Sequence, residues 1–482
     1  MSITIVGLGP GNPAHLTLEA WRILQEADEV YLRTDRHPTV SSLPSHLSLH
    51  SFDHLYEEKD DFTAVYEAIA AQVLALGRRP QGVIYAVPGH PLVGEASVQR
   101  ILVLAEEEGL KVHLVEGLSF IEPVLTCLGL DALDGLQIAD ATELAARCHP
   151  PLNPDVPTLV GQLYGRRLAS GVKLTLMNLL PDDHPLTLVR GAGTESVVVK
   201  TLPLYQLDRS DDIDHLTTLY IPPLPQPGSI ETFQDTVARL RAPDGCPWDR
   251  EQTHRSLRSC LLEETYEVLE ALDNDDPVKL REELGDLLMQ IVLHTQMAIE
   301  AGDFDLAQVV RSIDTKIKRR HPHVFGQAVV SDSAQVLHNW EEIKRGERGD
   351  EDHRSILDNV PKALPALAQA DAYQRRVARV GFDWPDIEGV MAKVAEEVRE
   401  LRGAADNREG ERELGDLLFS IVNLARWLEI DAESALRAAN ARFARRFVRM
   451  EHLCQARGQR LADLPLAEQD KLWEEVKEHE EI

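Results

Sequence analysis

Residues 261–294 read LLEETYEVLEALDNDDPVKLREELGDLLMQIVLH, and this stretch decides the fold of the C-terminal half of the chain. Read as a helix, its first part places Glu264 and Glu267 three residues apart on one face, beside an apolar stripe. The run DNDDP interrupts the helix, and Asp276 followed by Pro277 is a favourable start for the next one. The stretch therefore predicts a helical hairpin.

The second helix of the predicted hairpin carries two more acids with the same spacing, Glu283 and Asp286. If the helices pack antiparallel across the short connection, the four carboxylates converge on one patch. A hard divalent cation would relieve their repulsion and the cost of removing them from water. Because all the ligands are oxygens, the sequence predicts Mg²⁺ or Mn²⁺ rather than zinc.

The same pattern recurs in residues 394–424, which read VAEEVRELRGAADNREGERELGDLLFSIVNL. A single pair of acidic helices could equally present solvated faces that bind nothing. A solvated face has no reason to reproduce the spacing twice, so the repeat favours metal ligation in both hairpins. The second set of predicted ligands, which follows the first by 133 and then 130 residues, is Glu397, Glu400, Glu413 and Asp416.

Composition narrows the classes of protein that fit. The 482 residues allow about three domains, and 50 Lys and Arg against 80 Asp and Glu give a net charge of −30. That charge opposes non-specific binding to nucleic acid or to an anionic membrane surface. No apolar run approaches the ~18 residues that cross a bilayer, and the first residues lack the basic segment of a secretory signal. Five cysteines without CxxC spacing favour reduced thiols in a cytoplasmic protein.

Residues 1–205 alternate strand and helix signals, which predicts an α/β domain with a largely parallel first half. In such sheets ligands lie beyond the carboxyl ends of the strands. Two predicted strands end in glycine loops, GLGPGN at 7–12 and PGHP at 88–91. Because Pro10 has no N–H, GLGPGN is not a dinucleotide fingerprint, and alone it fits a tight turn without a ligand equally well. The predicted strands are 3–6, 30–32, 83–87, 112–115, 158–163 and 186–189, and the predicted helices are 18–27, 62–76, 95–107 and 168–179.

Four stretches of this domain resemble the tetrapyrrole methylase family. They are GLGPGNPAHLT at 7–17, YAVPGHPLVGE at 85–95, VEGLSF at 115–120 and VKLTLMNLLPDDHPLTLVRGAG at 172–193. The resemblance implies S-adenosylmethionine bound in a cleft between two α/β halves. It does not imply a porphyrin-type substrate, because PGHP stands where a GDP loop is usual and EGLSF where PGxSS is usual. The residues implied near the cofactor are Gly7, Gly9, Pro10, Gly11, Pro88, Gly89 and His90. For His90, a polar contact and a plain loop position are equally good interpretations.

Two stretches divide the chain into predicted parts. Residues 206–229 hold charges followed by the fragment PPLPQP, which favours an extended linker after the first domain. Residues 347–360 are polar and predict a second linker. The helical region is thereby divided into a first unit at 230–346 and a second unit at 361–482.

Basic pairs recur in the same order as the acids. Lys316 and Arg320 are four residues apart, as are Arg442 and Arg446, so each pair shares a helix face. Beside a metal site, such a pair can hold the phosphate oxygens that the metal leaves free. The alternative is a basic helix end that is favoured only by the helix dipole.

An aromatic and basic pair also recurs. Trp340 and Lys344 are four residues apart, and Trp473 and Lys477 repeat them 133 residues later. The tryptophans either anchor the core, which is their commoner role, or stack on a nucleobase.

The helical region resembles the MazG family of nucleoside triphosphate pyrophosphohydrolases. The resemblance rests on GCPWDREQTH at 245–254, LEETYEV, EELGDLLMQIVLH and RRHPHVFG at 319–326. It implies that both sets of acids bind Mg²⁺, and that a nucleoside triphosphate is hydrolysed to the monophosphate and pyrophosphate. The residues implied at the triphosphate- and activity-linked positions are Arg442, Arg446, Trp473 and Lys477. A lysine is usual where Arg442 stands.

On this interpretation water attacks the α-phosphate, activated by the metal. Glu263 and Glu396, each adjacent to a predicted ligand, are hypothetical acceptors of the water's proton. The residues predicted to stabilise the departing pyrophosphate are Lys316, Arg320, Lys344, Arg442, Arg446 and Lys477.

Three alternatives stay open. A di-iron carboxylate bundle would need a Glu-x-x-His motif, whereas the spacing here ends in Asp286 and Asp416. In the second alternative, one helical unit is catalytic and the other is a dimerisation scaffold. In the third, the N-terminal domain senses S-adenosylmethionine or a related nucleotide without methylating anything. Apolar stripes wider than one hairpin can cover predict a homodimer.

Overall fold

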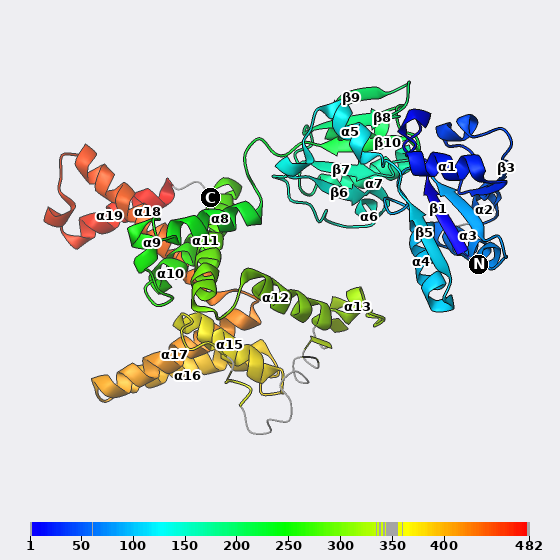
Figure 1. Cartoon of the computed structure of the whole chain (residues 1–482). Helices are drawn as coiled ribbons and strands as arrows, with labels where there is room; N and C mark the ends of the chain where they lie inside the picture. Colours follow the sequence, from blue (N-terminus) through cyan, green and yellow to red (C-terminus); the bar gives the residue numbers. More distant parts are fainter. Residues whose placement is uncertain are drawn as a thin grey trace. The chain divides into compact units, whose positions relative to one another are not determined.

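The computed structural model describes residues 2–59, 61–333, 335–336, 339–340, 343, 355–358 and 360–479. The chain forms two compact units, Met1–Arg239 and Leu240–Ile482 (Figure 1). The first unit combines strands and helices, and the second is helical. The predicted fold classes of the two regions are therefore confirmed.

The first half of the α/β unit is a parallel sheet with the strand order β3-β2-β4-β1-β5. Its strands are β1 Ser2–Gly7, β2 Glu29–Leu32, β3 Ser48–Ser51, β4 Val83–Val87 and β5 Lys111–Val115. Its helices are α1 Leu18–Glu26, α2 Asp53–Glu58, α3 Phe62–Gly77 and α4 Ala96–Glu108. Strand residues such as Ile3, Ile5 and Tyr85 are fully buried against α3 and α4. The parallel order places the carboxyl ends of β1 and β4 side by side, so the two predicted glycine loops meet.

The second half is a mixed sheet with the strand order β6-β7-β10-β8-β9. Only β6 and β7 pair in parallel, and the other pairs are antiparallel. The strands are β6 Gln137–Asp140, β7 Thr158–Gly161, β8 Pro185–Arg190, β9 Val198–Pro203 and β10 Thr217–Ile221, and the helices are α5 Ile121–Leu128, α6 Ala141–Ala145 and α7 Arg166–Leu176. Short 3₁₀ helices of the chain lie at Pro13–His15, Pro38–Ser42, Ala132–Asp134, Leu204–Arg209 and Leu461–Asp463.

The structure corrects the predicted linker at 206–229. The central strand of the second sheet, β10, lies inside that range and pairs with both β7 and β8. The residues that follow are also tied to the domain, because Asp155 accepts hydrogen bonds from the backbone N–H groups of Gly228 and Ser229. The prediction missed this strand because its short sequence, TTLYI, lies between charged residues and prolines. The α/β domain therefore extends past residue 205.

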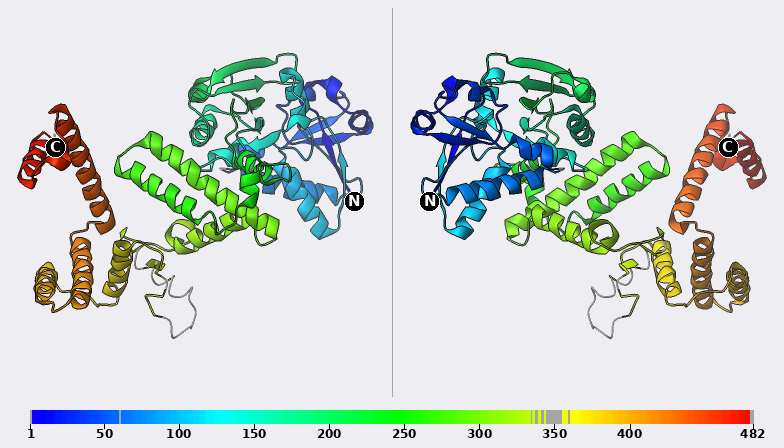
Figure 2. Two further views of the ribbon diagram at one scale, coloured as in Figure 1. Left: turned by 90° about the vertical axis from the view of Figure 1, so that its left-hand side faces the viewer. Right: turned by 90° about the vertical axis from the view of Figure 1, so that its right-hand side faces the viewer.

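The helical unit contains two long hairpins, as predicted (Figure 2). Helix α10, Arg258–Asp273, packs along α11, Pro277–Ala301, and α16, Ile387–Gly403, packs along α17, Asn407–Trp427. The two hairpin regions are joined by an ion pair between Arg437 and Asp273, with an Nε–Oδ2 distance of 3.2 Å. The other helices are α8 Ile230–Arg241, α9 Pro247–Glu251, α12 Leu306–Arg320, α13 Pro322–Phe325, α15 Ala366–Ala378, α18 Ala432–Ala456 and α19 Leu466–Glu478.

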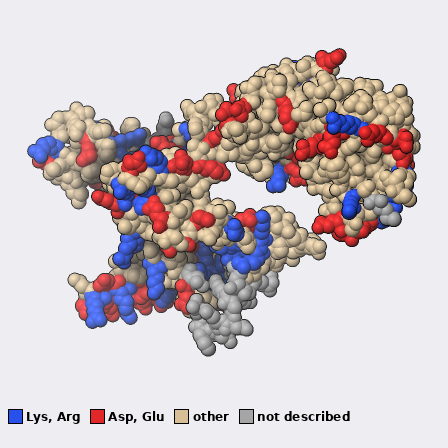
Figure 3. Space-filling model, in the orientation of Figure 1, with Lys and Arg blue, Asp and Glu red and all other residues tan. Residues whose placement is uncertain are grey.

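Most of the predicted second linker, 347–360, lies outside the described residues. Among the residues that are described, no helix has both the length and the hydrophobicity needed to cross a bilayer. Figure 3 shows that Lys and Arg side chains are interspersed with Asp and Glu over the helical unit on the face in view. On this face, a basic site for phosphate would therefore consist of a few neighbouring side chains rather than a broad basic surface.

Candidate functional site

The connection between α10 and α11 follows the sequence prediction closely. The Asp276 carboxylate accepts hydrogen bonds from the backbone N–H groups of Val278 and Lys279, each at 3.0 Å, and Pro277 occupies the first turn. This cap starts α11 directly after α10 ends, so the two helices fold back on each other. The acids of both helices are thereby brought to one face.

The first cluster consists of Glu264, Glu267, Glu283 and Asp286. Carboxylate oxygens of the three glutamates lie within 4.8 Å of one another, and Glu283 is buried. Asp286 is exposed one turn further along α11. Burial, followed by the charges of Asp286 and Glu267, raises the pKa of Glu264. Burial, followed by the charge of Glu267, likewise raises the pKa of Glu283. The carboxylates of the first cluster therefore repel one another.

The second cluster consists of Glu397, Glu400, Glu413 and Asp416, with Glu396 beside it. It contains two overlapping groups whose carboxylate oxygens lie within 4.8 Å of one another. One group is Glu396, Glu397 and Glu400, and the other is Glu397, Glu413 and Asp416. Glu397 and Glu413 belong to opposite helices of the hairpin and are both buried. The structure thus brings together every ligand predicted for the second unit.

Cationic side chains enter the second cluster but hardly touch the first. Lys393 Nζ lies 2.7 Å from Glu396 Oε1 and 2.8 Å from Glu397 Oε1, and Arg412 donates to Glu413. The hydrogen bond from Lys393 lowers the pKa of Glu396. In the first cluster, Lys279 Nζ is 4.0 Å from Glu283 Oε1. The first cluster therefore carries the larger uncompensated negative charge.

The donor set of both clusters fits a hard divalent cation. The ligand groups found in the described part of the chain contain only glutamate and aspartate, which are ligands that Mg²⁺ and Mn²⁺ prefer. Glu397 Oε2 is buried and has no hydrogen-bond partner among the described residues. A buried carboxylate oxygen without a partner is costly, and a metal ion would satisfy it. The absence of histidine from these groups also argues against the di-iron alternative.

Two of the predicted basic residues of the first unit lie on α12, where Lys316 is exposed and Arg320 is half-buried. Lys316 lies with Arg311 and Arg319 in a shallow hollow of about 450 Å³ that no carboxylate lines. Trp340 packs edge-on against His321, with ring centroids 4.9 Å apart. Arg320 is the last residue of α12, whereas Lys344 lies outside the described residues.

The corresponding residues of the second unit lie on α18 and α19. Trp473 packs 5.2 Å from the ring of Phe443 and against a small core that contains Met450 and Leu472. In this position Trp473 acts as a core anchor, which is one of the two roles that the sequence left open. Lys477 Nζ bonds to Glu474 at 2.8 Å on its own helix. Arg442 is exposed on α18 and Arg446 is half-buried one turn further on.

Of the two proton acceptors considered from the sequence, Glu263 is exposed on α10. Glu396 is half-buried and held by Lys393. Each adjoins a ligand of its cluster, as predicted, but only Glu396 is fixed by a side-chain contact within the described residues.

The two predicted glycine loops of the α/β unit contact each other. Gly9 and Gly89 exchange backbone hydrogen bonds, at 3.2 and 2.8 Å, and both have positive φ. A Cβ atom on Gly7 would lie 2.6 Å from the carbonyl oxygen of Gly89, so only glycine allows this approach. Gly11 also has a positive φ, of 126°. These residues shape the wall at the carboxyl ends of β1 and β4.

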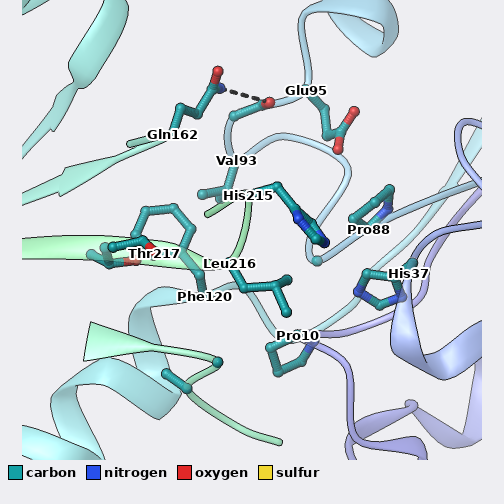
Figure 4. Close-up of a pocket in the computed structure, with 15 residues that line it drawn as sticks. Pro10, His37, Pro88, Val93, Glu95, Phe120, Gln162, His215, Leu216 and Thr217 are labelled. Atoms are coloured by element: carbon teal, nitrogen blue, oxygen red, sulfur yellow. Dashed lines mark hydrogen bonds between the residues drawn. The ribbon is translucent and has the colours of Figure 1, made fainter. Parts of the chain in front are cut away.

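A cavity of about 150 Å³ lies between the two sheets of this unit. Of the predicted cofactor residues, Pro10, Pro88 and Gly89 line it, whereas Gly7, Gly9, Gly11 and His90 do not. His90 instead accepts a hydrogen bond from the backbone N–H of Leu92 through its Nδ1. Figure 4 shows Pro10, His37 and Pro88 on one side of the cavity and His215 and Leu216 on the other.

Sequence reasoning missed the buried polar groups of this cavity. Glu95 lines it, is 6% exposed, and lies 3.4 Å from Arg33 Nε through its Oε1. Burial raises the pKa of Glu95 to about 7, despite the opposing charge of Arg33. His37 also lines the cavity, and burial, with the charge of Arg33, lowers its pKa to about 4.

Four buried polar atoms, from two residues that line the cavity and from two neighbours of Glu95, have no hydrogen-bond partner among the described residues. They are Arg33 Nε, His37 Nδ1, Tyr56 Oη and Glu95 Oε2. Buried polar atoms are nearly always satisfied, so their concentration in one place indicates a ligand site. The sequence did contain a signal for Glu95, because this residue ends the stretch YAVPGHPLVGE on which the family resemblance rests.

The fold and the clusters together define a fusion of a tetrapyrrole-methylase-like α/β domain with MazG-like helical hairpins. Residues 2–208 match the tetrapyrrole (corrin/porphyrin) methylases, and residues 252–325 match the MazG nucleotide pyrophosphohydrolase domain. The chain is 41% identical over 487 residues to the uncharacterized protein YabN of Bacillus subtilis, and the match covers 99% of each chain. The chain therefore belongs to the family represented by YabN.

Two further relatives correspond to single parts of the chain. The nucleoside triphosphate pyrophosphohydrolase/pyrophosphatase MazG of Thermotoga maritima is 45% identical over 248 residues, which cover 52% of this chain and 95% of that protein. The crystal structure of a uroporphyrin-III C-methyltransferase from Thermus thermophilus matches with a TM-score of 0.36 and 21% identity, covering 46% of this chain and 91% of that one.

Proposed function

We propose that the helical half hydrolyses nucleoside triphosphates to nucleoside monophosphates and pyrophosphate with the help of Mg²⁺ or Mn²⁺. The observation that carries the proposal is the convergence of carboxylates in each hairpin at the spacing found twice in the sequence. The name of the Thermotoga relative, which matches this half over 95% of its own length, supports the same reaction. In domain terms, the proposal assigns one hydrolase unit to 230–346 and another to 361–482.

The residues of the chain have distinct tasks in this reaction. The first and second clusters hold the divalent ion, which supplies an activated water and neutralises phosphate oxygens. In this proposal, Glu263 and Glu396 accept the proton of the attacking water. The residues assigned to the phosphate oxygens and the departing pyrophosphate are Lys316, Arg320, Lys344, Arg442, Arg446 and Lys477.

The base of the nucleotide is assigned to the tryptophans. Trp340 packs against His321 and Trp473 against Phe443, and an aromatic side chain can stack on any base. This assignment predicts weak base preference in the binding step.

The test is a panel of nucleoside triphosphates incubated with the full-length protein and Mg²⁺. Release of pyrophosphate supports the proposal, and release of orthophosphate or intact nucleotides would refute it. A Glu396→Gln variant that still binds Mn²⁺ but turns over more slowly supports the proton-acceptor role. Unchanged turnover would remove that role from Glu396.

For the α/β unit we propose binding of S-adenosylmethionine in the cavity between its sheets, followed by methyl transfer to an unidentified acceptor. The Gly9–Gly89 contact and the unsatisfied polar groups around Glu95 support a ligand at this place. Calorimetry with S-adenosylmethionine tests binding. Binding without methyl transfer in a product screen would favour a sensor instead.

The proposal includes a homodimer in the cytoplasm. Exposed apolar side chains on α10 and α11, among them Leu262, Leu284 and Leu288, offer a surface that a second copy can cover. Sedimentation equilibrium of the full-length protein measures the assembly directly. All five cysteines are free thiols, which suits a reducing compartment.

A further inference from the structure

The two clusters occupy equivalent positions of the tandem repeat but differ in the charges beside them. Cys260 in the first unit stands where Lys393 stands in the second, 133 residues later. Glu282 stands where Arg412 stands, 130 residues later. At these two positions the second unit has two cations that the first lacks and one acid fewer, whereas Lys279 of the first unit is replaced by Glu409.

These two cations touch the carboxylates that would bind a metal. Lys393 Nζ is 2.8 Å from Glu397 Oε1, and Arg412 donates to Glu413. Both carboxylates are buried, whereas the side chains of Lys393 and Arg412 are 35% and 71% exposed. The second cluster thus has internal counter-ions.

The first cluster has almost none. Lys279 Nζ lies 4.0 Å from Glu283 and bonds instead to Glu270 at 3.1 Å. Within the described residues, Glu264 and Glu267 form no ion pair. The charge of Lys279 acts on Glu267 and Glu283 only from a distance.

This difference changes what a metal ion gains on binding. In the first cluster, a divalent ion relieves repulsion that Lys279 relieves only in part. In the second, it must displace an ammonium and a guanidinium that already neutralise the buried carboxylates, and those cations then need new anionic partners. The oxygens of a polyphosphate are such partners, because lysine and arginine both bind phosphate well.

We propose that the two units take up metal in a different order. The first cluster binds a divalent ion without nucleotide. The second cluster binds one only together with a polyphosphate, onto which Lys393 and Arg412 move from Glu397 and Glu413. The substrate of the second unit is then the metal–nucleotide complex, an assignment that rests on the proposed hydrolase function.

The test counts bound Mn²⁺ on the full-length protein by the paramagnetic resonance signal of the free ion. The measurement is made without nucleotide and then with adenosine 5′-(α,β-methylene)triphosphate, which cannot be cleaved at the α–β bridge. The expected result is one tight ion per chain alone, and further ions with the analogue. Asp286→Asn should remove the ion that binds alone, and Asp416→Asn should remove only uptake that depends on the analogue.

A reciprocal exchange of side chains sharpens the assignment. The double variant Lys393→Cys/Arg412→Gln should let the second cluster bind Mn²⁺ without the analogue, at least tenfold more tightly than in the parent chain. The double variant Cys260→Lys/Glu282→Arg should weaken the first cluster by a similar factor. Arg402→Gln, which removes an exposed charge from α16, is the control and should change neither count.

The outcomes separate this inference from the proposed function. Two ions of equal affinity without the analogue, or exchange variants that bind like the parent chain, would overturn the order of uptake while leaving hydrolysis intact. A chain that binds no Mn²⁺ under either condition would overturn both.

Discussion

The two acidic hairpins show how one spacing of acids can produce two different electrostatic environments. In the first cluster, the pKa values of Glu264 and Glu283 are raised by burial and by neighbouring carboxylates. In the second, a hydrogen bond from Lys393 lowers the pKa of Glu396. The backbone geometry is shared, and the difference comes from residues one turn away. A repeat in sequence therefore does not guarantee a repeat in function.

The largest effect is expected from removing one ligand from each cluster. Asp286→Asn combined with Asp416→Asn should lower the rate of pyrophosphate release by ~100-fold or more, since metal stabilisation of the transition state is worth several kcal/mol. Asp303→Asn and Asp470→Asn, at exposed acids outside the clusters, form the matched control.

The single variants Asp286→Asn and Asp416→Asn measure how much each hairpin contributes to the rate of pyrophosphate release. If both units work, each single variant keeps part of the rate. A single variant as inactive as the double one would leave one catalytic unit, and a double variant with full activity would contradict the assignment of both clusters.

The next effect concerns Glu95, a buried carboxylate that lies 3.4 Å from Arg33 Nε. Its pKa of about 7 in the folded protein lies above the unfolded value of 4.5. The stability that this group contributes is therefore fully present below pH 4.5 and is lost as the pH rises through about 7. Relative to Glu95→Gln, the parent chain should lose up to about 3 kcal/mol of unfolding free energy across this window.

Denaturant unfolding of both proteins from pH 4 to 8 measures this slope. His37, with its pKa lowered to about 4, gives a slope of opposite sign that is present in both proteins and cancels in the difference. Glu108→Gln, which removes an exposed partner of Arg78, is the control. Parallel curves for the parent chain and Glu95→Gln would show that one arginine suffices to keep Glu95 ionised.

A smaller effect separates the counter-ions of the two clusters. Without divalent ions, Lys393→Ala should lower the unfolding free energy by at most about 1 kcal/mol, because Lys393 is partly exposed. Lys279→Ala, whose amine lies 4.0 Å from Glu283, should change it less. Added Mg²⁺ with a nucleotide analogue should restore the Lys393→Ala protein. Equal losses in the two variants would mean that the clusters are electrostatically alike.

The smallest effect is a difference in pH dependence between single acids. Because the folded pKa of Glu264 is raised, its contribution to stability is lost as the pH rises, so Glu264→Gln should stabilise the metal-free protein at neutral pH. Because the pKa of Glu396 is lowered, its contribution is lost as the pH falls, so Glu396→Gln should destabilise the protein at neutral pH. Melting temperatures in chelator at pH 4.5 and 7.5 check both signs, and shifts of the same sign would contradict the comparison.

The sequence predicted the parts of this molecule that local patterns determine. The three-residue spacing of the acids predicted that acids from both helices of each hairpin come together, and the Asp276–Pro277 start of α11 predicted the turn of the first hairpin. The two glycine loops followed from strands that end in glycine, whereas their contact became visible only from the pairing of β1 with β4. Local periodicity is a strong signal because it does not depend on distant contacts.

What the sequence did not show depends on contacts between distant segments. Arg33 and Glu95 are brought together only because β2 and β4 are neighbours in the sheet. Strand β10 is short and lies between charges and prolines, so its central place in the second sheet depends on pairing with β7 and β8. The pairing of Lys393 with Glu397 spans one helical turn and was visible in principle, but its importance appeared only when Glu397 proved to be buried.

The most direct test of the central claim is hydrolysis of a nucleoside triphosphate by the full-length chain in H₂¹⁸O with Mg²⁺. Attack of water at the α-phosphate predicts one ¹⁸O atom in the nucleoside monophosphate, unlabelled pyrophosphate, and no reaction in chelator. Label in pyrophosphate, release of orthophosphate, or a nucleotide left intact with the metal supplied would contradict it.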